Sequence, residues 1–134
     1  MNGQQDPKQA RKVVQTSAAP AAVGPYSQGI VANGLVFAAG QIGIDPATGT
    51  LVPDDITAQT RRVIENLAAV LQEAGASLRT VVKTTVFLSD MKHFSAMNDE
   101  YARHFATNPP ARSTVQVARL PKDALVEIEA IAAP

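Results

Sequence analysis

Residues 29–39, Gly-Ile-Val-Ala-Asn-Gly-Leu-Val-Phe-Ala-Ala, contain two β-prone runs separated by Asn33-Gly34. Asn-Gly between such runs is the strongest short-range signal for a β-hairpin, because both central residues of the turn need a positive φ. Gly40 to Ile44 continues the extended chain, and residues 45–49 have the Pro and Gly of a tight turn. This segment predicts a sheet that begins with antiparallel strands, after a short strand at residues 13–16.

A helix is predicted to follow this turn. Between residues 56 and 74, hydrophobic residues recur at steps of three and four and form one apolar stripe, with Gln59 largely off it. Asp54 or Asp55 can cap the start of this helix, and Gly75 stands where a left-handed residue ends it.

The second half of the chain predicts one more helix and three more strands. A β-branched run at Val81–Leu88 indicates a central strand, and a shorter helix then ends before Asn108-Pro109-Pro110. The last two strands, at Ala111–Arg119 and Leu125–Ala132, are expected to pair as a hairpin. The fold class is α+β: one six-stranded mixed sheet with two helices on one face, in the order β-β-β-α-β-α-β-β.

Length and composition narrow the functional classes. The chain has 134 residues, which fits one domain, expected at residues 12–134 after a loose tail at 1–11. Twelve basic and twelve acidic side chains cancel, which argues against a general phosphate-binding surface. The absence of Cys excludes disulfides, thiol nucleophiles and Cys-based zinc sites. No signal peptide or apolar span is present, so a cytoplasmic protein without membrane contact is expected.

The helix-free face of the predicted sheet is too apolar for water. On the last strand, Leu125, Glu127, Glu129 and Ile131 share that face, so hydrophobic and ionisable groups are mixed. A symmetric homo-oligomer that buries this face explains both features. The periodicity fits a dimer or a trimer equally well.

Arg112 and Glu127 are the most informative ionisable pair. In the predicted hairpin they occupy one sheet face, and at about 3.3 Å per residue they stand roughly 13 Å apart. Both groups can therefore contact one small substrate only if Arg112 of one subunit meets Glu127 of its neighbour. The alternative is a solvated Arg and an unrelated surface Glu.

Other residues are less specific by themselves. Tyr26 follows a rigid Gly24-Pro25 corner and either offers its hydroxyl to a pocket or caps the core. Gly40 either admits close approach of a ligand or permits a bulge. His93 and His104 lack the spacing of metal ligands, so no metal site is expected.

Several motifs together resemble the reactive intermediate deaminase A (RidA) family, also called YjgF, over residues 13–132. They are Ala-Pro-Ala-Ala-Val-Gly-Pro-Tyr-Ser-Gln at 19–28, Ala-Gly-Gln-Ile-Gly-Ile-Asp-Pro-Ala-Thr-Gly at 39–49, Val-Lys-Thr-Thr-Val-Phe-Leu at 82–88, Pro-Ala-Arg-Ser-Thr-Val-Gln-Val-Ala-Arg-Leu-Pro-Lys-Asp at 110–123 and Glu-Ile-Glu-Ala-Ile-Ala at 127–132. The resemblance implies a homotrimer of chorismate-mutase-like subunits with sites between subunits. It also implies cofactor-free hydrolysis of 2-imino acids such as 2-iminobutanoate and 2-iminopropanoate to 2-oxo acids and ammonia.

The resemblance also implies roles for six residues. Arg112 binds the substrate carboxylate, Glu127 holds and polarises the attacking water, and Tyr26 lines the pocket. The substrate-binding positions are Gly40, Asn98 and Thr114. The chain departs from many relatives in having Thr114 in place of Cys, a mild change that removes any thiol-based regulation if only the backbone acts there. It also has Ala39 in place of Ser, which removes a possible hydroxyl contact and bears on substrate preference.

Two other functions compete with the deaminase. One is an endoribonuclease or translation inhibitor, as some relatives are described, although zero net charge and 4% aromatic residues argue against nucleic-acid binding. The other is a trimer that binds small ligands or acts as a holdase without turnover.

Overall fold

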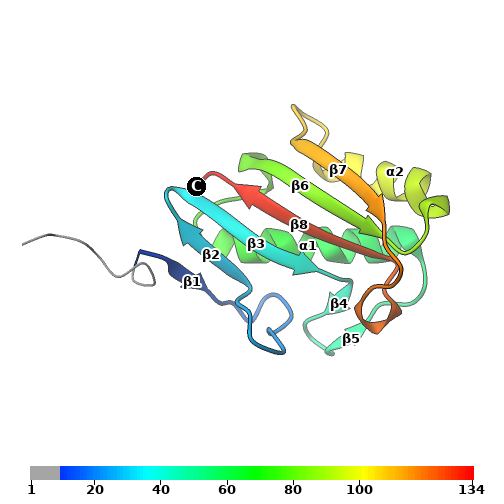
Figure 1. Cartoon of the computed structure of the whole chain (residues 1–134), viewed down its shortest axis with the longest axis horizontal. Helices are drawn as coiled ribbons and strands as arrows, with labels where there is room; N and C mark the ends of the chain where they lie inside the picture. The colour runs from blue at the N-terminus through cyan, green and yellow to red at the C-terminus, as the bar shows by residue number, and fades with distance from the viewer. Residues whose placement is uncertain (1–9) are drawn as a thin grey trace, which may run out of the picture.

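The computed structural model describes residues 10–134, so the predicted tail at 1–11 falls mainly outside it. Two helices lie on one face of a six-stranded sheet, as the sequence predicts (Figure 1). In the order of the sheet, the strands are β1 (Lys12–Val14), β2 (Gly29–Ala32), β3 (Leu35–Gln41), β8 (Val126–Ala132), β6 (Val81–Leu88) and β7 (Ala111–Gln116). The helices are α1 (Ile56–Glu73) and α2 (Phe94–His104), and a small second sheet joins β4 (Ile44–Asp45) to β5 (Thr50–Leu51).

The predicted hairpin is confirmed. β2 and β3 pair antiparallel, and both turn residues between them have positive φ, 52° at Asn33 and 71° at Gly34. The turn at residues 45–49 is also confirmed, with Gly49 at φ 74°. The strands β4 and β5 on either side of this turn were not expected, because a two-residue strand leaves no periodicity to read.

Helix α1 begins and ends where its signals indicate. The Asp55 side chain accepts a hydrogen bond from the Thr57 N–H, and Gly75 follows the helix at φ 84°. The predicted stripe packs on the sheet, but Gln59 is fully buried as well, which corrects its expected position off the stripe. Its amide is paired with loop backbone, which is how a buried polar group avoids a large desolvation cost.

The predicted hairpin of the last two strands is wrong. β7 pairs with β6 in parallel, and β8 lies on the other side of β6, antiparallel to it (Figure 1). Because α2 connects β6 to β7, those strands form a crossover unit in which parallel neighbours are favoured. β7 carries polar residues on both faces and is mostly exposed, as suits an edge strand.

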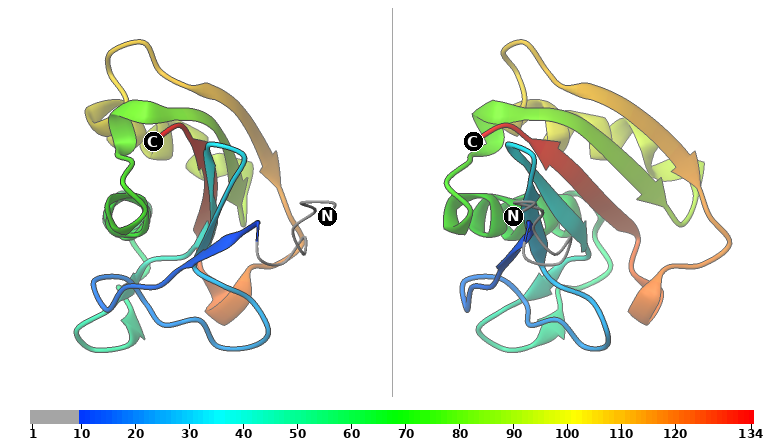
Figure 2. Two further views of the ribbon diagram at one scale, coloured as in Figure 1. Left: turned by 90° about the vertical axis from the view of Figure 1, so that its left-hand side faces the viewer. Right: turned by 60° about the vertical axis from the view of Figure 1, so that its left-hand side comes forward.

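β8 takes an interior position because one of its faces is entirely small or apolar. Val126, Ile128 and Ala130 are buried against the helices. Figure 2 shows the helices and the sheet as two layers. The buried hydrophobic residues of the core lie between these layers. Its largest fully buried hydrophobic side chains include Val36, Ile64, Leu67, Leu71, Leu88, Met97 and Ile128.

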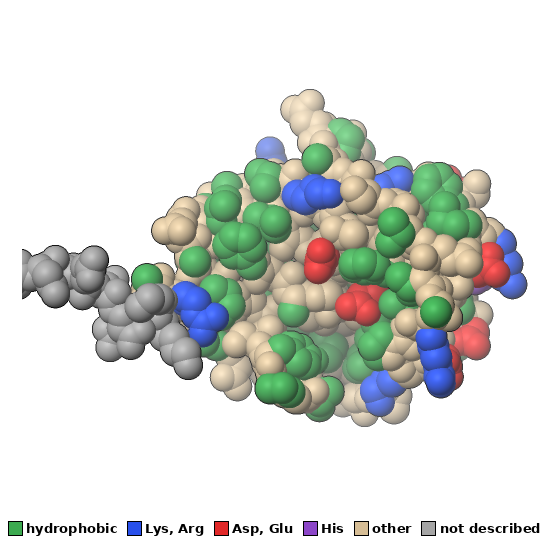
Figure 3. Space-filling view, viewed as in Figure 1, with side chains coloured by type: hydrophobic (Ala, Val, Ile, Leu, Met, Phe, Trp, Pro, Cys, Tyr) green, Lys and Arg blue, Asp and Glu red, His purple; other side chains and the backbone are tan. Residues whose placement is uncertain are grey.

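The other face of the sheet carries no helix. The pairing registers place Phe37, Phe87, Val115 and Ile131 there, together with Lys83, Glu127 and Glu129. Figure 3 views this face and shows acidic side chains near its centre among hydrophobic ones. The predicted mixture of apolar and ionisable groups is therefore present. Among residues 10–134, neither helix has the length and hydrophobicity needed to span a bilayer.

Candidate active site

Three of the six predicted site residues line one cavity. Tyr26, Gly40 and Glu127 border a space of about 500 Å³, called here the Glu127 cavity. Its other walls come from loop residues before β2, the chain between β3 and β4, and the turn before β8. The apolar part of the lining includes Pro20, Val23, Ile42, Ile44 and Pro121.

Gly40 provides the room for the Glu127 side chain. Between Ala38 and Gln41, β3 carries one more residue than the paired stretch of β8, so Gly40 lies in a β-bulge. A Cβ atom on Gly40 would overlap Oε2 of Glu127 and lie 2.9 Å from its Cδ. The bulge interpretation of this glycine is therefore confirmed, and the group that lies against it is the Glu127 carboxylate.

The environment of Glu127 makes it easier to protonate than an ordinary carboxyl. Partial burial raises the pKa of Glu127, and the negative charge of Glu129 raises it further. Glu129 lies two residues along β8, faces the same side and lines the same cavity. A carboxyl whose pKa moves toward neutrality is suited to accept and return a proton during a reaction.

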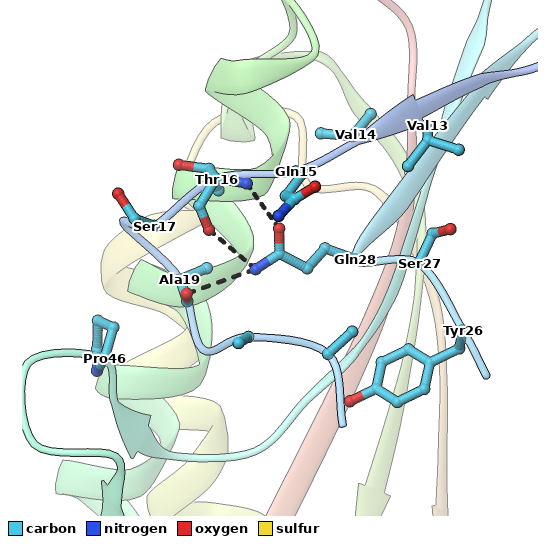
Figure 4. A pocket seen from close by; sticks show the side chains of 12 residues that line it. Val13, Val14, Gln15, Thr16, Ser17, Ala19, Tyr26, Ser27, Gln28 and Pro46 are labelled. Carbon is cyan, nitrogen blue, oxygen red and sulfur yellow. Dashed lines mark hydrogen bonds between the residues drawn. The ribbon is translucent and has the colours of Figure 1, made fainter. Parts of the chain in front are cut away.

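Tyr26 reaches the cavity from a loop that doubles back on itself. Gly24 has φ 124°, its carbonyl accepts the Tyr26 N–H at 2.9 Å, and the Val23 N–H points to the Tyr26 hydroxyl at 3.4 Å. The ring is half exposed, so the expected alternative of a core cap does not describe it. Figure 4 shows the Tyr26 ring beside the loop that leads from β1 to β2.

The other three predicted residues lie by the edge strand β7. The Arg112 guanidinium stacks on two aromatic rings of α2, with its carbon 4.8 Å from the Tyr101 centroid and 5.7 Å from that of Phe94. The Tyr101 hydroxyl is itself fixed by a buried 2.7 Å hydrogen bond with Thr84. Within residues 10–134, Arg112 forms no ion pair with a carboxylate.

Asn98 and Thr114 have polar atoms free for a partner. The Oδ1 of Asn98 and the Oγ1 of Thr114 are buried and have no hydrogen bond to any described residue. Thr114 stands two residues after Arg112 on β7, and Asn98 shares the side of α2 that bears Phe94 and Tyr101. We call Asn98, Arg112 and Thr114 the Arg112 cluster. Buried polar atoms without a partner are rare and suit ligand contact.

The Glu127 cavity and the Arg112 cluster lie on opposite faces of the sheet. On β6, Arg112 is opposite Thr84 and Glu127 is opposite Phe87, three residues away. Side chains alternate along a strand, so an offset of three directs the two groups to opposite sides. This corrects the prediction of a shared face, which rested on the wrong strand pairing.

The arrangement offers acid–base chemistry in one place and anion binding in another. Glu127 can exchange protons, and Arg112 presents a planar fork that matches a carboxylate. Within the described chain, no three His, Asp or Glu side chains come together as metal ligands would.

Two residues that line the cavity were not among the site residues predicted from the sequence. Glu129 shares the face of Glu127 at a spacing of two, and this spacing is a signal that was available. Gln28 was visible only as the last residue of a motif, yet it is buried and forms hydrogen bonds to loop backbone.

Comparisons with known proteins agree with this architecture. A RutC family protein of Pyrococcus abyssi is 54% identical over 123 residues, covering 92% of this chain and 97% of the relative. A protein of Capra hircus named 2-iminobutanoate/2-iminopropanoate deaminase is 45% identical over 122 residues, covering 91% of this chain and 89% of its own. The crystal structure of E. coli TdcF with bound serine superposes with a TM-score of 0.88 at 44% identity, covering 92% and 98% of the two chains.

The family model described as Endoribonuclease L-PSP matches residues 16–134, nearly all of the described chain. That span contains all six predicted site residues, from Tyr26 to Glu127. The chain therefore belongs to the Endoribonuclease L-PSP family, which is the RidA/YjgF family.

Proposed function

We propose that this protein is a cofactor-free deaminase that hydrolyses 2-imino acids, such as 2-iminobutanoate and 2-iminopropanoate, to 2-oxo acids and ammonia. The observation that carries the proposal is the half-buried Glu127 carboxyl, with a raised pKa, in a cavity that Tyr26 and Gly40 also line. Relatives named 2-iminobutanoate/2-iminopropanoate deaminase support the substrate class.

The active site in this proposal forms between subunits of a homotrimer. Arg112 stands on an edge strand, on the face opposite to Glu127, so one chain does not hold both groups against a small molecule. A neighbouring subunit that covers the apolar helix-free face brings its own Arg112 toward the Glu127 cavity. Burial of that face also removes exposed hydrophobic surface from water.

Arg112 binds the substrate carboxylate. Its guanidinium has no competing carboxylate within residues 10–134, and the stacked rings of Phe94 and Tyr101 limit its motion. A bidentate contact fixes the orientation of the acid, and orientation of this kind lowers the barrier for attack at the adjacent carbon.

Glu127 supplies the proton transfers. Water attacks the carbon of the protonated imine while the Glu127 carboxylate accepts a proton from that water, and the C=N electron pair moves to nitrogen. Glu127 then returns the proton to the nitrogen of the carbinolamine. The C–N bond breaks with its electrons on the departing ammonia, the hydroxyl proton leaves as C=O forms, and the released proton ends on ammonia as ammonium. Iminium acid and water thus give 2-oxo acid and ammonium.

A trapping assay tests the proposal. Threonine dehydratase generates 2-iminobutanoate in the presence of semicarbazide, and wild type should divert the imine from the trap. Glu127→Gln should lower kcat about 10²–10⁴-fold, because it removes the proton acceptor. Arg112→Ala should mainly raise KM, because it removes carboxylate binding.

Two surface variants serve as matched controls. Arg119→Ala removes an arginine whose partner is the exposed Asp123, and Glu73→Gln removes an exposed carboxylate at the end of α1. Both should behave as wild type. The deaminase proposal is wrong if wild type does not compete with semicarbazide, and the anchor role is wrong if Arg112→Ala retains wild-type kinetics.

The family description makes RNA cleavage the second candidate. The walls that residues 10–134 of one chain give to the Glu127 cavity oppose it electrostatically, because they carry two carboxylates, Glu127 and Glu129, against one cation, Lys122. Incubation of single-stranded RNA with the same preparations should leave it intact. Cleavage that disappears in Glu127→Gln would favour a nuclease.

A further inference from the structure

Gln28 is the most buried polar residue of the segment that carries Tyr26. Only 3% of it is exposed, and it directly precedes β2. Its Oε1 accepts the Thr16 N–H at 2.7 Å, while its Nε2 donates to the carbonyls of Thr16 at 3.0 Å and Pro20 at 2.8 Å. A third acceptor, the Ala19 carbonyl, lies at 3.4 Å. Figure 4 shows this amide between β2 and the loop.

These hydrogen bonds take the place of strand pairing. β1 pairs with β2 only as far as Val14 and Gly29, so the backbone at Thr16 has no ladder partner on β2. The Gln28 side chain meets both the N–H and the carbonyl of Thr16, as an opposing strand would, and also holds Pro20. It thereby closes the base of the loop at residues 16–27.

The same loop determines where the Tyr26 hydroxyl lies. Pro20 and Val23 belong to the wall of the Glu127 cavity, and the Val23 N–H points to the Tyr26 hydroxyl. The main chain of Gln28 also accepts the Ala39 N–H at 2.9 Å, next to the bulge at Gly40. One residue therefore links the loop that carries Tyr26 to the strand that makes room for Glu127.

Resting on the proposed function, we propose that Gln28 is a positioning residue: its buried amide fixes the loop at residues 16–27 so that the Tyr26 hydroxyl stays at the Glu127 cavity. Both ends of the amide are needed. A carboxylate at this position would lack the N–H donors and would face the carbonyls of Thr16 and Pro20. An apolar side chain of similar length would meet neither donor nor acceptor.

A double-mutant cycle on kcat/KM tests this role. Gln28→Met keeps the length of the side chain and removes every amide hydrogen bond, and it should lower kcat/KM by about 10- to 100-fold, as misplacement of a site group does. In a Tyr26→Ala background the same substitution should change kcat/KM less than twofold. That result means that Gln28 acts through Tyr26.

Gln59→Met is the matched control. Gln59 is equally buried and pins the chain at Val52 and Leu125 rather than the loop of Tyr26. Its effect on kcat/KM should be the same with Tyr26 present or absent. If Gln28→Met is additive with Tyr26→Ala in the same way, Gln28 has only a structural role and the inference is overturned.

Hydrogen exchange separates this inference from the deaminase proposal and covers variants that fold poorly. In Gln28→Met, the amide of Thr16 and the peptide that carries it should exchange faster, while β6 and β8 keep wild-type protection. If wild type lacks imine hydrolysis but this local change in exchange is seen, the deaminase proposal fails and the positioning role of Gln28 in its loop remains. Unchanged exchange at residues 16–27, or a Gln28→Glu variant with wild-type kcat/KM, contradicts the positioning role of Gln28.

Discussion

At the residue scale, three features of its surroundings set the position and the pKa of the Glu127 carboxyl. Gly40 admits the side chain because it has no Cβ, partial burial disfavours the charged form, and Glu129 adds a like charge. No single one of these features is a catalytic motif. Their coincidence on one strand and one bulge is the basis for proposing proton transfer in the Glu127 cavity.

Glu129→Gln should shift the pH dependence of imine hydrolysis. Glu127 must be deprotonated to accept a proton from water, so kcat/KM falls as pH decreases through the pKa of Glu127. Removal of the Glu129 charge lowers that pKa, so the acid limb should move to lower pH. Glu73→Gln should leave the limb in place. A shift to higher pH would refute the role assigned to Glu129.

At the element scale, Glu100 joins the two helices. It is 2% exposed on α2 and accepts hydrogen bonds from Arg61 of α1 at 3.3 Å, and its Oε2 lies 2.8 Å from His104 Nε2. Burial alone would raise the pKa of Glu100, but the hydrogen bonds and charges of Arg61 and His104 outweigh it, so the pKa lies below its ordinary value. The contact holds α2, whose rings support Arg112.

From the contacts of Glu100 with Arg61 and His104, we predict that the free energy of unfolding depends on pH. A carboxyl with a lowered pKa in the folded state contributes stability above its unfolded pKa, and that contribution is lost as pH falls through the folded pKa. Glu100→Gln should lower the free energy of unfolding at pH 7 by up to about 3 kcal/mol. The difference in free energy of unfolding between wild type and Glu100→Gln should become smaller as pH falls below about 4, near the pKa of Glu in the unfolded chain.

Urea unfolding between pH 3 and pH 8 measures this gap. Glu65→Gln is the control, because Glu65 forms a half-exposed pair with Arg62 that should contribute little. A gap between wild type and Glu100→Gln that stays constant across this range would show that the charge of Glu100 does not stabilise the fold.

At the scale of the whole molecule, the two groups of site residues lie on opposite faces of one sheet. Arg112 lies on the helix side, on the edge strand β7 and against the Tyr101 ring of α2, whereas Glu127 lies on the helix-free face. A site composed of both requires a second chain. The proposed trimer is therefore a condition for the proposed chemistry, and mixing experiments can test it directly.

Arg112→Ala and Glu127→Gln should complement one another. After subunit exchange at equal concentrations, a site between unlike subunits can combine an intact Arg112 with an intact Glu127. Random assembly in a ring gives this combination at about one quarter of the sites, so about a quarter of wild-type activity should return. At a substrate concentration far below the KM of Arg112→Ala, each variant alone should keep only its own reduced activity, and sedimentation should verify mixed oligomers. Mixed oligomers without activity would exclude an intersubunit site.

Local features of the sequence determined the elements of this protein. Asn33-Gly34 required a turn with positive φ, the three- and four-residue spacing with Asp55 and Gly75 defined α1, and the motifs identified the family. Each of these signals depends on backbone preferences or on residues close in the chain, so no knowledge of distant contacts was needed.

Only the tertiary structure decided which strands are neighbours and which groups share a face. A hairpin between the last two strands satisfied every local pattern, yet β6 lies between them, because β8 has an apolar face to bury and β7 suits an edge. That order moved Arg112 to the helix side, and the packing of α1 against loops buried Gln59. Strand order and the burial of Gln59 depend on competition among contacts between distant segments. The side-chain periodicity within one segment carries no information about that competition.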